Sequence, residues 1–138
     1  MKRMAVMLAV TLAVGIALAT FGSRSLNAQQ EPFKRTMLLR TDLKGLEGKE
    51  GVVLLVELAP GAAAGKHYHP GDEVNYVLEG SVVLEIEGKP PITLQTGATS
   101  HIPAGEVHNV TNASASGPLK LLVIWVAEKG QPLAVPVK

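Results

Sequence analysis

Two histidines stand one residue apart in the stretch GKHYHPGDEVNYVLEG, and a glutamate follows four positions after the second of them. On a β-strand, His67 and His69 would point to the same side, because successive side chains alternate between the two faces. The turn Pro70–Gly71–Asp72 would then let Glu73 enter the next strand on that same side. Imidazole and carboxylate groups gathered in this way predict a site for a divalent metal ion.

A further ligand has to come from one of the two other histidines, His101 and His108. Ile102 is the better core residue in its segment, so the adjacent His101 should face outward. His108 follows the turn formed by Pro103 and Gly105 and begins a new strand, which makes it the preferred ligand. Any one of these histidines alone would more often be a surface or hydrogen-bonded residue, and the metal prediction depends on their combination.

Three histidines and one carboxylate suit Fe(II), Mn(II), Ni(II) or Zn(II), and we expect one ion per chain with Fe(II) or Mn(II) favoured. Four protein ligands, His67, His69, Glu73 and His108, leave two positions of a six-coordinate ion open. Open positions are typical of catalytic metal sites, whereas structural sites are closed.

The elements that must position these residues are short β-strands. Runs of β-forming residues, such as GVVLLVEL, EVNYVL, SVVLEIE and LKLLVIWVA, alternate with Gly, Pro and Asn, and no helical period is evident. This rhythm predicts an all-β antiparallel sandwich or barrel. We expect a tight turn at Glu79–Gly80 to join two of the strands, LLVIWV to be a buried central strand, and residues 128–138 to form an extended tail that packs on a partner chain.

Residues 1–28 have the order of a secretory signal, with Lys2 and Arg3, an apolar run to about Phe21, and a polar stretch ending at Ala28. A Sec-type signal of this kind predicts a periplasmic or secreted bacterial protein. The alternative is an uncleaved membrane anchor, because the apolar run approaches the roughly 20 residues that span a bilayer. A membrane is expected as a partner only in that case.

Composition argues against a nucleic-acid partner and excludes cysteine chemistry. Without residues 1–28 the chain has 10 basic and 12 acidic residues, a net charge of −2, so nucleic acid is not an expected partner. The chain has no cysteine, which excludes disulfides, thiolate ligands and thiol nucleophiles.

The spacing of these residues closely resembles the two motifs of the cupin family, and each is matched without a gap. The first, G(X)5HXH(X)3,4E(X)6G, reads from Gly61 through His67, His69 and Glu73 to Gly80; the second, G(X)5PXG(X)2H(X)3N, reads from Gly97 through His108 to Asn112. The resemblance implies a jelly-roll double-stranded β-helix barrel, here over residues 33–127. It also implies that His67, His69, Glu73 and His108 are the metal ligands and that Asn112 is a turn residue or a residue that supports the ligands, rather than a ligand itself.

Because cupins carry out many reactions, the fold does not specify one. The resemblance favours an Fe- or Mn-dependent enzyme of dioxygenase type that acts on a small organic molecule, with Glu73 as a ligand or as a general base. The alternative is a non-catalytic periplasmic module that binds a metal or a small ligand. Strand parity predicts a small, mostly apolar pocket lined by Asn75, Val77 and Val110.

The outward face of the strand that follows Glu73 carries Val74, Tyr76 and Leu78, which are all apolar. Such a face requires cover from a second sheet or another subunit. We therefore expect a homodimer in which residues 33–40 pair across the interface.

Overall fold

The computed structural model describes residues 31–138, so the signal-like segment 1–28 lies outside the described residues. All regular structure in residues 31–138 is β, as the sequence predicts, and no helix there is long and apolar enough to cross a membrane. The ten strands are β1 (Phe33–Asp42), β2 (Lys49–Leu58), β3 (His67–Tyr68), β4 (Asp72–Glu79), β5 (Ser81–Ile86), β6 (Ile92–Gln95), β7 (Thr99–Ile102), β8 (His108–Asn112), β9 (Leu119–Glu128) and β10 (Val135–Pro136).

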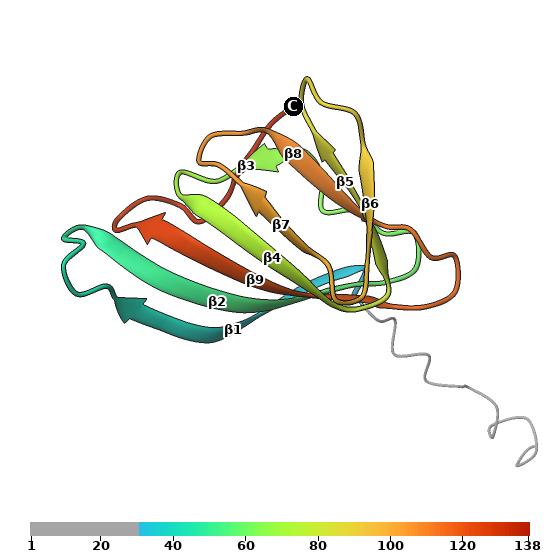
Figure 1. The fold of residues 1–138 in the computed structure, drawn as a ribbon, viewed down its shortest axis with the longest axis horizontal. Helices are drawn as coiled ribbons and strands as arrows, with labels where there is room; N and C mark the ends of the chain where they lie inside the picture. The colour runs from blue at the N-terminus through green and yellow to red at the C-terminus, as the bar shows by residue number, and fades with distance from the viewer. Residues whose placement is uncertain (1–30) are drawn as a thin grey trace, which may run out of the picture.

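The strands form two antiparallel five-stranded sheets, which Figure 1 shows at the lower left and the upper right of the molecule. The first sheet has the order β1-β2-β9-β4-β7, and the second has the order β10-β3-β8-β5-β6. Neighbours in each sheet are mostly distant in sequence, and β2 pairs with β9 along its whole length. Residues far apart in the chain are therefore brought to one interior.

The core lies between the inner faces of the sheets and follows the period-two alternation of the strands. From Val52 to Leu58 every second residue of β2 is apolar and buried, namely Val52, Leu54, Val56 and Leu58, and Glu50 is also buried, while the intervening residues are only partly buried. The facing side chains of β9 include Leu121, Val123 and Trp125. Because every second residue of these strands is apolar and buried, their register is fixed, since a shift by one residue would turn the apolar set outward.

The segment between the two motif strands does not form the hairpin that we expected at Glu79–Gly80. Gly80 has a φ of +87° and separates β4 in the first sheet from β5 in the second, so the chain changes sheets there. A Cβ atom on Gly80 would lie 2.5 Å from the main-chain oxygen of Pro118, and one on Gly71 would lie 2.0 Å from that of Val126. At Gly71 and at Gly80 two backbone segments approach each other so closely that only glycine fits.

Strand β9 is central in the first sheet, as predicted, but the prediction that both of its faces are buried is wrong. Its inner residues are buried, whereas Ile124 and Val126 on the outer face are exposed. Val74, Tyr76 and Leu78 of the adjacent β4 are also exposed on this outer face. No second sheet of residues 31–138 covers it, and it forms an exposed apolar surface.

The C-terminal tail packs on its own chain through the short strand β10. Val135 and Pro136 pair with Tyr68 and His67 and add β10 to the second sheet, and the Val137 N–H donates to the Lys66 oxygen over 3.0 Å. Strand β1, which we expected at a subunit interface, likewise pairs with β2 of its own chain.

Asn112, the last residue of the second motif, ties two loops together from a buried position. Its Nδ2 donates to the main-chain oxygens of Leu58, Ala59 and Gly117 at 2.9–3.1 Å, and its Oδ1 accepts from the Ser114 N–H. This confirms a structural role for Asn112 in the turn rather than contact with the site.

Candidate metal centre

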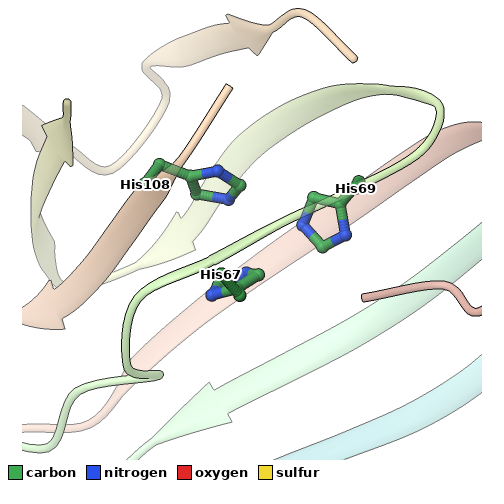
Figure 2. Close-up of side chains that lie close together, drawn as sticks. All are labelled: His67, His69 and His108. Atoms are coloured by element: carbon green, nitrogen blue, oxygen red, sulfur yellow. The ribbon is translucent and has the colours of Figure 1, made fainter. Parts of the chain in front are cut away.

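Three predicted ligands, His67, His69 and His108, lie together between the sheets. His67 and His108 are register partners on β3 and β8, and their ring centroids are 4.4 Å apart, while His69 lies 4.8 Å and 5.1 Å from them. Figure 2 shows the three rings grouped around a common space. One ring nitrogen from each can be chosen so that all three atoms lie within 4.8 Å of one another, which suits three ligands of one ion.

The hydrogen bonds of the rings go to Nδ1 and leave Nε2 as the nitrogen that could bind a metal ion. Each Nδ1 lies within hydrogen-bond distance of a main-chain oxygen: His67 of Gly65 at 2.6 Å, His69 of Leu133 at 2.6 Å, and His108 of Glu106 at 2.9 Å. Since a carbonyl only accepts, each neutral ring carries its proton on Nδ1 and has a lone pair on Nε2. The Nε2 atoms of His69 and His108 are buried and have no hydrogen-bond partner, which is costly unless something else binds them.

Burial keeps two of the three histidine rings in the neutral form that can bind a cation. Desolvation is the largest influence on His67 and on His108, and it lowers the pKa of each ring below the usual value. Both rings are therefore neutral near pH 7, as metal ligands must be.

Glu73 lies beside His69 and His108, whereas within residues 31–138 the group of ligand atoms close enough to share one ion comprises the three histidines alone. Its Oε2 lies 2.6 Å from His69 Nε2, without the alignment of a hydrogen bond, and its Oε1 lies 4.0 Å from His108 Nε2. Asn75 Nδ2 donates to Oε1 over 2.7 Å, and Trp125 Nε1 donates to Oε2 over 2.5 Å. Burial raises the pKa of Glu73, but His69, Trp125 and Asn75 together outweigh burial and lower the pKa to about 2.

His101 lies apart from the cluster, as the parity argument predicts. It is exposed on β7, and its Nε2 is 3.9 Å from Asp72 Oδ2 on the surface. The preference for His108 over His101 as a member of the cluster agrees with the structure.

Comparison with known proteins gives the family. The sequence profile of the cupin domain matches residues 54–125, more than half of the chain. The chain belongs to the cupin family. Among solved structures, the TT1209 protein of Thermus thermophilus is 33% identical, with a TM-score of 0.59 over 70% of this chain and 85% of that one.

Two other relatives delimit what the family membership supports. The tetracenomycin polyketide synthase protein TcmJ of Streptomyces glaucescens is 34% identical over 58 residues, which span 41% of this chain and only 38% of TcmJ. A Klebsiella pneumoniae protein with a double-stranded β-helix domain is 20% identical, with a TM-score of 0.62 over 77% of this chain and 87% of that one. The jelly-roll double-stranded β-helix predicted for this cupin is thereby confirmed.

The cupin site opens into a small cavity of about 30 Å³, or about 360 Å³ of empty space when its open mouth is counted. Asn75 and Val110 line it as predicted, whereas Val77 belongs to the closed core and does not. Most of the remaining wall is apolar and includes Val56 and Leu121.

Sequence reasoning missed several groups at the site. Trp125 is the only tryptophan of the chain and has the inward parity of its strand, a signal that could have placed it near Glu73. Phe33 and Arg35 also line the cavity, although their segment was assigned to an interface. The Leu133 oxygen that accepts from His69 is a main-chain atom, so its residue type gave no signal.

Proposed function

We propose that this cupin is an enzyme that uses one divalent metal ion, Fe(II) or Mn(II) in preference to Ni(II) or Zn(II), to oxidise a small organic molecule in a dioxygenase-type reaction. The observation that carries the proposal is the pair of buried, unpartnered Nε2 atoms on His69 and His108. Together with the fixed Nδ1–H tautomers, they fit a metal ion better than any other occupant, since a cation needs lone pairs and no protons there.

His67, His69 and His108 would hold the ion, and Glu73 would supply the fourth ligand. When bound, the ion would act as a Lewis acid and redox centre for the substrate. Main-chain oxygens keep the rings in one tautomer. The Glu73 carboxylate would offset one unit of the positive charge of the ion, and the apolar cavity wall would limit the entry of water.

The surroundings of Glu73 favour a fixed ligand over a mobile general base. Its two oxygens are held by Asn75 and Trp125, and a pKa of about 2 makes the carboxylate a weak proton acceptor near pH 7.

A non-catalytic metal or ligand carrier is the second candidate, and the cavity lining favours it in one respect. Apart from the four proposed ligands, the only ionisable side chain that the described chain places in the wall is Arg35, and arginine side chains do not serve as general bases. Any proton transfer would therefore have to involve the metal ligands, water or the substrate itself.

Metal analysis tests the site. Wild type, the double variant His67→Ala/His69→Ala and the control His101→Ala are loaded with Mn(II) or Fe(II) and dialysed. We expect about one equivalent in wild type and in the His101 control, and none in the double variant; equal content in all three would refute the ligand assignment. O₂ uptake across phenolics, diketones and flavonols then separates the enzyme from the carrier, because a loaded protein that consumes no O₂ favours the carrier.

We also propose that the exposed outer face of the first sheet mediates a homodimer. Val74, Tyr76, Ile124 and Val126 place apolar side chains side by side on β4 and β9, and burial of such a patch drives association. Sedimentation that shows only monomer at micromolar concentration would contradict this. A periplasmic or secreted location rests on residues 1–28 alone and stays a prediction, to be checked by fractionation and N-terminal sequencing.

A further inference from the structure

Arg35 lies on the edge strand β1, where its side chain is exposed to solvent and also lines the cavity of the histidine cluster. It pairs in register with Val56, and Phe33 pairs with Leu58; both partners are buried on the inner face of the sheet. Arg35 and Phe33 therefore share that face, and both line the cavity of the histidine cluster. The Arg35 guanidinium lies 4.7 Å from the centre of the Phe33 ring, a contact that helps to hold it in place.

The charge of Arg35 has no partner among residues 31–138. Its neighbours are paired: Lys34 lies 3.6 Å from Glu57, and Arg40 binds Glu50 through two nitrogens. No carboxylate of the described chain lies within ion-pair distance of Arg35. An exposed guanidinium that lines a mostly apolar cavity and has no acidic partner can bind an anion that enters the cavity.

The charge of the cavity points the same way. Apart from the four proposed metal ligands, Arg35 is the one charged side chain of residues 31–138 that lines the cavity, and its charge is positive. A cavity of this sign attracts small anions and raises their rate of entry.

Asn75 supplies a second recognition group. The carboxylate of Glu73 can only accept, so the amide nitrogen of Asn75 must face it, and that nitrogen also lies 3.3 Å from Ser100 Oγ. The amide oxygen Oδ1 is left buried without a partner, and Asn75, only 4% exposed, lines the same cavity. A ligand that donates a hydrogen bond would satisfy this oxygen.

We propose that the cavity binds a small hydroxy acid whose carboxylate pairs with Arg35 and whose hydroxyl donates to Asn75 Oδ1. The proposal deepens the proposed function, since it names the substrate class of the same site. It requires both groups in one small molecule, because Arg35 recognises a negative charge and Asn75 Oδ1 recognises a donor.

The test uses three matched compounds: lactate, lactamide, which lacks the charge, and propionate, which lacks the hydroxyl. Binding is followed by the fluorescence of Trp125, the only tryptophan in the chain and part of the cavity wall, in Mn(II)-loaded and metal-free protein. We expect wild type to bind lactate about tenfold or more tightly than either analogue, since each analogue leaves a polar group unpaired.

Variants assign the two preferences. Arg35→Gln should remove the preference for lactate over lactamide, Asn75→Ser should remove the preference for lactate over propionate, and the outward neighbour variant Lys34→Gln should keep both. The proposal is overturned if lactate does not bind, or if Arg35→Gln binds lactate as wild type does. Metal content is measured in the same samples, so failure of the metal site would appear as loss of Mn(II) from wild type, separately from the lactate result.

Discussion

Removal of residues 132–138 should weaken the metal centre without touching a ligand. The deletion takes away the Leu133 oxygen that lies 2.6 Å from His69 Nδ1, together with the pairing of β10 with β3 at His67. Without that acceptor, no group holds the His69 proton on Nδ1, and the proton can move to Nε2, which lies 2.6 Å from Glu73 Oε2. The lone pair needed for the ion is then lost part of the time.

The expected loss of metal affinity can be estimated from the hydrogen bonds that hold ligating histidines in other metalloproteins. Loss of the hydrogen-bond partner of a ligating histidine typically costs about 10–100-fold in metal affinity. This corresponds to about 1.4–2.7 kcal/mol of binding free energy. The effect falls on the metal affinity, because the core between β2 and β9 remains intact.

Competition with a chelating dye measures the Mn(II) affinity of wild type, the deletion, and a control lacking only residues 137–138. The control keeps the Leu133 oxygen and both β10 pairs, and loses the hydrogen bond from Val137 to Lys66. Near-UV circular dichroism reports whether each protein is folded. A folded 132–138 deletion that binds Mn(II) as tightly as wild type would show that the tail does not orient His69.

Three further outcomes follow from the described contacts. Asn112→Ala leaves buried main-chain oxygens unpaired and should destabilise the protein by about 2 kcal/mol, lowering Tm by roughly 10 °C; an unchanged melting curve would contradict its role as a loop tie. Trp125→Phe keeps an aromatic ring but removes the hydrogen-bond donor to Glu73, so the pKa of Glu73 should rise. The free energy of unfolding of the metal-free protein, measured in urea, should fall by about 1.5–3 kcal/mol. Equal stability of the variant and wild type would rule this out. The pKa values of His67 and His108 are lowered in the folded state, so the unfolded chain binds more protons below pH 6.5 and the stability of the metal-free protein should fall there. Stability should fall again between pH 4.5 and about 2, as Glu73 is protonated. A stability that rises on acidification from pH 7 to 5 would contradict this reasoning.

The sequence was sufficient for the parts of the fold that depend on local pattern. Strand alternation and motif spacing predicted the all-β fold and brought His67, His69 and His108 to one side. Strand parity also separated His108 from His101, since the two lie on different strands with opposite facing.

Features that depend on which strands are neighbours could not be predicted in this way. The change of sheet at Gly80 depends on the approach of Pro118, which is distant in sequence. The cavity role of Arg35 depends on the position of β1 at the edge of the first sheet, and the Leu133 oxygen acts through the main chain, which has no residue-type signal. In each case the missing information is the long-range pairing rather than the local propensity.

The strand order has a consequence for the kinetics of folding. Strand β2 pairs with β9, and β3 pairs with both β8 and β10, so the fold is dominated by contacts between distant parts of the chain. Proteins with such high contact order fold slowly, because loop closure must precede the contacts that compensate for it. The histidine rings and the Leu133 oxygen come together only when β3 has paired with β8 and with β10, which are distant from it in sequence. An ion captured at that late stage would slow unfolding while leaving the folding rate almost unchanged.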